Sequence, residues 1–176
     1  GDDGLTRRRA AAGTAALAQN LPISAEDLPA LLAWAKENRP DLTVVGPEGP
    51  LCLGITDTFN AAGLRVFGPC QSAARMEGSK LFSKEVMNAA GVPTARSQSF
   101  DDAAAAVTAL GRFSLPVVIK ADGLAAGKGV IIAQTRDEAV AAVRSMLVDA
   151  VFGRAGAQVL IEEFLEGEEA SILALV

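Results

Sequence analysis

Two short apolar segments joined by a glycine-rich stretch constrain the fold of this chain more than any other feature. Residues 116–120 (Pro-Val-Val-Ile-Lys) and 130–133 (Val-Ile-Ile-Ala) have the length and β-branched composition of strands. The stretch between them contains glycines at 123, 127 and 129. Two strands joined by a glycine-rich turn predict an antiparallel hairpin.

The preceding part of the chain has a different pattern. Ser24-Ala25-Glu26-Asp27 is a capping box followed by apolar residues at helical spacing, and Pro40 ends that helix. Residues 42–45 and 64–67 predict strands, the first of them buried, and each is followed by Gly-Pro. Residues 51–62 predict a helix with Gly63 just beyond its end. Strand, helix and strand at these lengths indicate a parallel sheet of the doubly wound kind.

The second half mixes helices with antiparallel strands. We expect one helix from about residue 79 to 90. A second should begin after Ser99, with two aspartates in its first turn, and a third should run from Thr135 to about residue 148. Further strands are expected at residues 158–161 and from residue 168 onward. This pattern predicts an α+β layer. We therefore expect two domains, a partial doubly wound α/β domain over residues 1–79 and an α+β domain over residues 80–176.

Composition excludes several classes of function. Half of the 176 residues are hydrophobic, so the chain can build a core and is not intrinsically disordered. Its net charge of −5 gives no general attraction to nucleic acid or to anionic lipid. With no histidine, Ser-His and Cys-His catalysis are excluded within this chain, and two cysteines cannot make a four-ligand zinc site. Scarce cysteine fits a reducing cytosol.

The two ends are abrupt. The start lacks the charged-then-apolar order of a signal peptide, residues 1–9 match no pattern that we can name, and residues 169–176 stop inside an apolar run. No segment reaches the ~18 uninterrupted apolar residues that a membrane span needs. We therefore expect a piece of a longer protein.

The glycine-rich stretch has the composition of a phosphate-binding loop. Glycines let backbone N–H groups approach a phosphate, and Lys120 and Lys128 supply positive charge. A P-loop would need a glycine where Asp122 stands and a hydroxyl where Gly129 stands, and it would open a helix. The segment predicts a phosphate-covering hairpin of another kind. The alternative is an ordinary flexible turn with incidental lysines.

Three further segments are candidates for ligand contact, each with a plainer alternative. Residues 160–169 run from an apolar strand into an acidic connector that would suit a flat heterocycle and its ribose, or would be a solvated turn. Lys80 stands at a helix start near the domain junction, or is simply exposed. Gly46-Pro47-Glu48 follows a parallel strand, at the edge where open α/β sheets bind ligands, or is only a turn.

Together these segments resemble the glycinamide ribonucleotide synthetase (phosphoribosylamine–glycine ligase) family, within the ATP-grasp superfamily. The resemblance covers nearly the whole chain and is carried by residues 41–48, 67–69, 77–80, 119–130 and 161–171, with a weaker match at residues 13–20. The glycine-rich Gly-Gly-Arg-Glu-His turn with which this family normally opens is not in the sequence. The resemblance implies a truncated N-terminal substrate-binding domain over residues 1–79 and the nucleotide-clamping part of an ATP-grasp domain over residues 80–176.

The resemblance also implies which residues bind ligands. Lys80 and Lys120 would contact the ATP phosphates beneath the hairpin, the backbone at Glu163 and Leu165 would hold adenine, and Glu169 would hold the ribose. The expected ATP-binding residues are Lys80, Lys120, Gly123, Leu124, Ala125, Ala126, Gly127, Lys128, Gly129, Glu162, Glu163, Phe164, Leu165 and Glu169. The phosphoribosylamine pocket would include Gly46, Pro47 and Glu48.

The activity that the resemblance implies is the ATP-dependent joining of glycine to 5-phosphoribosylamine, a cytoplasmic step of purine synthesis. Its cofactors would be ATP and Mg²⁺ (or Mn²⁺), with metal ligands beyond residue 176, and its partners small molecules rather than nucleic acid or membrane. No catalytic side chain is expected in this chain, which alone should be inactive. Two alternatives stay open, namely another ATP-grasp carboxylate–amine ligase of nucleotide synthesis and a non-catalytic ATP-binding fragment. A Rossmann dinucleotide site is disfavoured because no G-x-G-x-x-G follows a strand.

Overall fold

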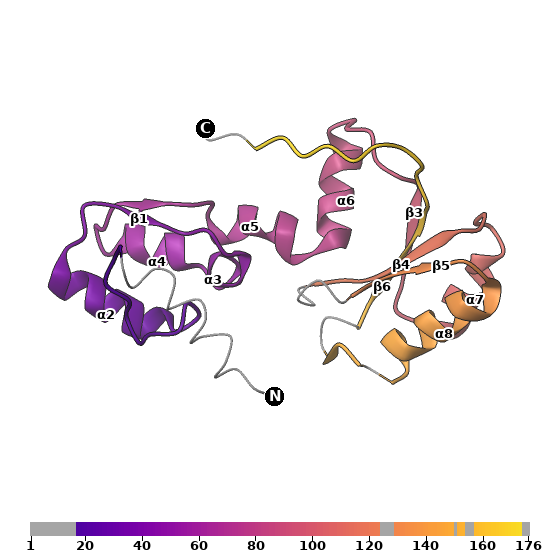
Figure 1. The fold of residues 1–176 in the computed structure, drawn as a ribbon, viewed down its shortest axis with the longest axis horizontal. Coiled ribbons are helices and arrows are strands. Elements are labelled where there is room, and N and C mark those ends of the chain that lie inside the picture. Colours follow the sequence, from indigo (N-terminus) through magenta and orange to yellow (C-terminus); the bar gives the residue numbers. More distant parts are fainter. Residues whose placement is uncertain (1–16, 124–128, 150, 154–156, 174–176) are drawn as a thin grey trace. The chain divides into compact units, whose positions relative to one another are not determined.

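A computed structural model describes residues 17–123, 129–149, 151–153 and 157–173. The chain divides into two compact units, one ending at Gly68 and the other beginning at Pro69. Each unit is described by itself (Figure 1). Within the described residues, no helix is both long and apolar enough to cross a membrane.

The first unit is built around a parallel pair of strands. In chain order it contains α2 (Leu28–Asn38), β1 (Thr43–Val44), α3 (Glu48–Cys52), α4 (Ile55–Ala61) and β2 (Val66–Phe67). Thr43 pairs with Val66 and Val44 with Phe67, in parallel. Gly63, at φ 69°, ends α4 through a hydrogen bond from its N–H to Asn60 O of 3.0 Å. The strand–helix–strand prediction is confirmed.

Details of this unit differ from the prediction. Gly54, in the left-handed region at φ 88°, breaks the expected single helix into α3 and α4. Asp27 rather than Ser24 caps α2, because its carboxylate accepts a hydrogen bond from Ala30 N at 3.1 Å. The strand expected to be buried leaves Val44 66% exposed, since β1 pairs only with β2 within the described residues.

The second unit is an antiparallel sheet with helices. Its elements are α5 (Gln71–Gly78), α6 (Lys80–Ala89), β3 (Ser97–Phe100), α7 (Ala103–Leu110), β4 (Val117–Ala121), β5 (Val130–Ala133), α8 (Arg136–Leu147) and β6 (Val159–Glu163). The strand order is β3-β6-β4-β5, with every neighbouring pair antiparallel. The predicted hairpin is confirmed as β4–β5, with Lys120 opposite Val130. The fold is therefore the mixed class expected, a parallel pair followed by an antiparallel α+β layer.

Alternation along the strands gives the sheet two unlike faces. One face carries fully buried residues such as Val117, Ile119 and Ile161. They pack against α7 and α8, which lie side by side (Figure 1). The intervening residues, which include Lys120, Leu160 and Glu162, belong to the opposite face. α6 lies on that opposite side (Figure 1).

Two predictions in this unit are wrong, and one helix was not predicted. Ser99 lies within β3, and Asp102 caps α7 instead, accepting a hydrogen bond from Ala105 N at 2.7 Å. Helix α5 was not expected, although its end places Ser79 as the cap of α6. No strand begins at Glu168 within the described residues, where Ile172 is 94% exposed and has no strand beside it.

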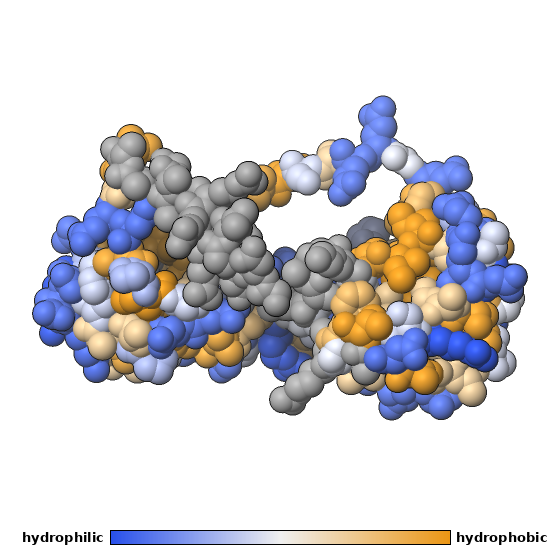
Figure 2. Space-filling view, turned by 60° about the horizontal axis from the view of Figure 1, so that its bottom comes forward, coloured by the Kyte–Doolittle hydropathy of each residue, from blue (hydrophilic) through white to orange (hydrophobic). Residues whose placement is uncertain are grey.

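The surface of the second unit carries hydrophobic as well as hydrophilic residues (Figure 2). Val130 and Ile132 of the edge strand β5 are among the large hydrophobic side chains left exposed, together with Leu165 in the segment after β6. Single exposed hydrophobic residues are normal in folded proteins and need no partner to explain them.

Candidate functional site

The candidate site lies on the face of the sheet that α7 and α8 leave open. β4 contributes Lys120 and β6 contributes Glu162, which alternation places on the same side as their paired neighbours Leu160 and Val118. α6 contributes lysines at positions 80 and 84, one helical turn apart. The site is therefore built from rigid elements, and its lysines converge from a helix and a strand.

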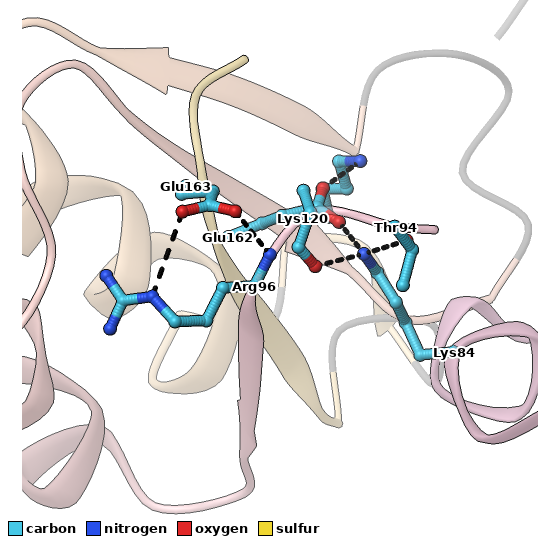
Figure 3. Close-up of polar contacts among 7 residues, drawn as sticks. Lys84, Thr94, Arg96, Lys120, Glu162 and Glu163 are labelled. Atoms are coloured by element: carbon cyan, nitrogen blue, oxygen red, sulfur yellow. Dashed lines mark hydrogen bonds and ion pairs between the residues drawn. The ribbon is translucent and has the colours of Figure 1, made fainter. Parts of the chain in front are cut away.

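A buried carboxylate joins two of these lysines. Glu162 is only 5% exposed, and its carboxylate oxygens form ion pairs with Lys84 Nζ and with Lys120 Nζ (Figure 3). Lys84 Nζ also donates to Thr94 Oγ1 at 2.6 Å and to Ala95 O at 2.8 Å. The ammonium of Lys84 is thus held by three acceptors, whereas Lys120 remains partly exposed.

The first residues of the hairpin loop are bonded to the start of α6. Lys80 Nζ donates to Gly123 O at 2.9 Å. The Asp122 carboxylate accepts from Ser79 Oγ and from Leu81 N, each at 3.1 Å. Across the loop, Ala121 N donates to Gly129 O at 2.8 Å. These bonds position the base of the loop over the same lysines.

Burial and charge act together on Lys80. Burial lowers the pKa of the Lys80 ammonium below its ordinary value of 10.5, and the neighbouring charge of Lys120 lowers it further, while Asp122 and Glu77 oppose both effects. The groups joined by these hydrogen bonds and ion pairs include three lysines and the two carboxylates of Asp122 and Glu162, which leaves one positive charge before the charge of Glu77 is counted. The arrangement favours an anion.

The neighbouring acid, Glu163, is turned to the other side of β6. Its carboxylate accepts a hydrogen bond from Arg96 N at 2.7 Å and pairs with Arg96 Nε at 3.8 Å (Figure 3). The Glu163 N–H donates to Arg96 O at 3.0 Å. The Glu163 N–H is therefore already used within the protein.

The structure brings only some of the predicted site residues together. It brings together Lys80, Lys120, Gly123, Gly129 and Glu162. Phe164, Leu165 and Glu169 lie in an exposed irregular segment after β6. The remaining predicted loop residues, at positions 124–128, lie outside the described residues. Gly46, Pro47 and Glu48 are exposed at the carboxyl end of β1, in the first unit.

Sequence reasoning missed three residues of this site. Lys84 stands one turn after Lys80 on the same helix, a spacing that was available in the sequence. Asp122 was noticed only as a departure from a P-loop, although its carboxylate accepts a hydrogen bond from Leu81 N in the first turn of α6. Thr94 has no sequence signal, since it becomes an acceptor for Lys84 only through the fold.

The described residues line a cavity in each of the two units. A polar one of about 290 Å³ lies between α6 and β3 and includes Lys84, Asn88, Ser97 and Leu160 in its lining. A cavity of about 300 Å³ in the first unit is lined mostly by apolar residues, among them Trp34, Val45 and Phe59. Throughout the described part of the chain, no group of three metal-ligating side chains is close enough to hold a metal ion.

Family models match both parts of the chain. The N domain of phosphoribosylglycinamide synthetase matches residues 5–77, and its ATP-grasp (A) domain matches residues 78–176. The chain belongs to the phosphoribosylglycinamide synthetase family. The two matches meet at residues 77 and 78, in the last turn of α5, while the compact units divide earlier, at Gly68.

Proteins similar to this member of the phosphoribosylglycinamide synthetase family are named as ligases. Phosphoribosylamine–glycine ligase from Escherichia coli O6:H1 is 53% identical over 158 residues, which is 90% of this chain. The crystal structure of phosphoribosylamine–glycine ligase from Thermotoga maritima matches with a TM-score of 0.70 at 30% identity, over 89% of this chain and 37% of that one. The chain spans about 37% of the length of the curated relatives it matches.

The fold is also similar to that of a second solved structure. The biotin carboxylase domain of 2-oxoglutarate carboxylase from Hydrogenobacter thermophilus, in complex with MgADP, ADP and bicarbonate, matches with a TM-score of 0.66 at 25% identity. That match covers 80% of this chain and 32% of that one.

Proposed function

We propose that the protein to which these residues belong joins glycine to 5-phosphoribosylamine with ATP, giving glycinamide ribonucleotide, ADP and phosphate, and that this chain supplies the part that holds ATP. The single observation that carries the proposal is the set of three lysines around two carboxylates on the open sheet face, in a chain of this family. Its surplus positive charge suits a polyphosphate.

In this proposal Lys80 and Lys120 contact the phosphates of ATP. Both extend from regular elements, so their ammonium groups are positioned before the ligand arrives. The loop over residues 123–129 covers the phosphates, and its base is already bonded to α6 through Asp122. The backbone at Glu163 and Leu165 serves adenine, and Glu169 serves the ribose. Because the Glu163 N–H is bonded to Arg96 O, the contacts proposed for adenine are the Glu163 carbonyl and the Leu165 N–H.

A divalent metal is expected with ATP in such chemistry, as the MgADP complex of the Hydrogenobacter domain illustrates. The described residues of this chain do not fit a metal site by themselves. The carboxylates of Asp122 and Glu162 already accept from Ser79 and Leu81, and from two lysines, respectively. We propose that Mg²⁺ or Mn²⁺ is held by residues beyond position 176.

The chemistry asked of this chain is charge neutralisation and alignment. In the proposed reaction the glycine carboxylate attacks the γ-phosphorus of ATP, ADP leaves, and the amine of phosphoribosylamine then displaces phosphate from the acyl phosphate. Lys80 and Lys120 would offset charge on the phosphate oxygens without giving up a proton. No nucleophilic side chain or general base of this chain is needed, consistent with its lack of histidine.

The phosphoribosylamine site is proposed at Gly46, Pro47 and Glu48. They follow β1 at its carboxyl end, the edge at which open α/β sheets bind ligands. A Cβ at Gly46 would meet no described atom within 4 Å, so neither packing nor a left-handed backbone calls for glycine there. Close approach of a ligand would account for it.

The partners proposed for the protein are these small molecules, and its location the cytoplasm, in keeping with few cysteines. The test measures ADP release by a protein that contains this chain and is as long as its relatives. We expect release that requires both glycine and phosphoribosylamine and that falls in Lys120→Met. Release with another carboxylate–amine pair but not this one would indicate a different ATP-grasp ligase. ATP binding without any turnover would leave only a nucleotide-binding module.

A further inference from the structure

We propose that Lys84 is a positioning residue whose charge compensates Glu162, so that Lys120 keeps its own charge for the phosphates of the ligand. The inference rests on the proposed function, because it assumes that Lys120 contacts phosphate. It assigns a role to a residue that makes no contact with the expected ligand.

The contacts of Lys84 favour this role over direct ligand binding. Lys84 is 8% exposed, and its ammonium is held by Glu162, by Thr94 Oγ1 at 2.6 Å and by Ala95 O at 2.8 Å. An ammonium has three N–H donors, so these three acceptors use its full capacity. Lys84 has no donor left for a phosphate.

The consequence for Lys120 is a matter of charge. Glu162 places one oxygen on Lys84 and the other on Lys120 (Figure 3). With both lysines present, Lys84, Glu162 and Lys120 together carry one net positive charge. Of the three side chains, that of Lys120 is the most exposed. Without the charge of Lys84, Glu162 and Lys120 would cancel, and a phosphate would meet a neutral ion pair.

The alternative is that Lys84 only supports the fold. A buried carboxylate that loses a partner destabilises the folded state, so a simple loss of binding in a Lys84 variant would not separate the two roles. The double variant does separate them. Glu162→Gln removes the negative charge that Lys84 is proposed to offset, and Lys84 should then matter little for phosphate binding.

The experiment is a calorimetric titration of the full chain with MgATP and, separately, with inorganic tripolyphosphate. Lys84→Gln keeps an N–H donor but removes the charge, and we expect both ligands to bind about tenfold more weakly. In the Glu162→Gln background, adding Lys84→Gln should change either affinity by less than about threefold. Lys36→Gln on α2, which removes the same charge from an exposed position of the other unit, should bind both ligands as the parent does.

The outcomes are distinguishable. If Lys84→Gln weakens ligand binding equally in the parent and in the Glu162→Gln background, the inference is overturned, because Lys84 would not act through the carboxylate. Unchanged affinity in Lys84→Gln would also overturn it, as would a loss for ATP without one for tripolyphosphate. If Lys84→Gln does not fold, the comparison of Glu162→Gln with the double variant decides alone. A parent that binds neither ligand would instead refute the proposed function.

Discussion

Lys80 is the residue in which burial and function oppose each other most directly. Its ammonium is partly buried, lies near the like charge of Lys120 and donates a hydrogen bond to Gly123 O. The neighbouring lysine is a cost in the free protein and an advantage when an anion binds, since one phosphate group can neutralise both. Perturbed pKa values of this kind are common at functional sites.

The pH dependence of stability follows from the lowered pKa of Lys80. Below that pKa Lys80 is protonated in both the folded and the unfolded chain, and burial of its charge destabilises the folded chain by the full amount. Between it and 10.5 the folded chain has released the proton while the unfolded chain retains it. The free energy of unfolding therefore rises with pH through this window.

The variant that isolates this effect is Lys80→Met, which has no amine at this position. We expect the stability of the parent relative to Lys80→Met to increase as pH rises toward 10.5. Urea unfolding at several pH values measures the difference, and other titrating groups cancel in it. A difference that stays constant over this range would mean that folding does not shift the pKa of Lys80, and one that shrinks would mean that folding raises it; either would contradict the prediction.

Asp122 is the residue that joins the hairpin to α6. Its carboxylate accepts from Ser79 Oγ and Leu81 N, whereas Asp102 caps α7 through one bond to Ala105 N. We expect Asp122→Ala to lower the free energy of unfolding by about 2 kcal/mol and Asp102→Ala by about 1 kcal/mol. Chemical denaturation measures both; equal losses would mean that the bonds between elements add nothing to the local cap.

At the scale of elements, local signals and tertiary pairing account for different parts of the fold. The hairpin β4–β5 and helix α8 were predictable because strand composition and the Thr135 capping box are local; Thr135 Oγ1 indeed accepts from Glu138 N at 3.2 Å. β3 (Ser97–Phe100) was not, because its polar sequence becomes a strand only by pairing with β6. The strand expected from residue 168 failed for the converse reason, since apolar composition does not make a strand without a neighbour.

The same division holds for the site. Lys80 and Lys120 could be placed at a helix start and beside a glycine-rich loop from local sequence, although their contact with phosphate was implied only by the family resemblance. The role of Glu162 does not, because the connector was expected to begin after Ile161, whereas β6 continues to Glu163 and turns Glu162 toward two lysines. Partners that are far apart in the sequence leave no local pattern.

The turns after β1 and β2 offer a matched pair of glycines. A Cβ at Gly68 would lie 2.9 Å from Leu51 Cδ2 and 3.2 Å from Thr56 Oγ1, both in buried residues, whereas a Cβ at Gly46 would meet no described atom within 4 Å. We expect Gly68→Ala to lower the free energy of unfolding by about 1–3 kcal/mol. Gly46→Ala should change it by less than about 0.5 kcal/mol.

The functional expectation runs the other way for Gly46. If phosphoribosylamine approaches this turn, Gly46→Ala should raise its KM in the full-length protein while the melting temperature stays at the parental value. A folded Gly46→Ala variant with parental KM would remove this turn from the proposed pocket.

At the scale of the whole molecule, the two units divide the proposed labour. The first carries the turn proposed for phosphoribosylamine, and the second carries the lysines and the loop proposed for ATP. Because the chain spans about 37% of the length of its relatives, we expect the 176 residues alone to bind ATP weakly and to catalyse no ligation. Glycine-dependent ADP release by this chain, at the ~1 s⁻¹ of ordinary enzymes, would place the missing machinery within it.

The most direct test of the central claim, that the lysine cluster of the second unit binds the phosphates of ATP, is calorimetric titration with MgATP of the parent, Lys120→Met and Lys36→Met. A charge-assisted contact contributes roughly 1.5–3 kcal/mol, so Lys120→Met should weaken binding by about ten- to a hundredfold. Lys36→Met, which loses the same charge from an exposed position on α2, should bind as the parent does. Equal affinity for all three proteins would contradict the account.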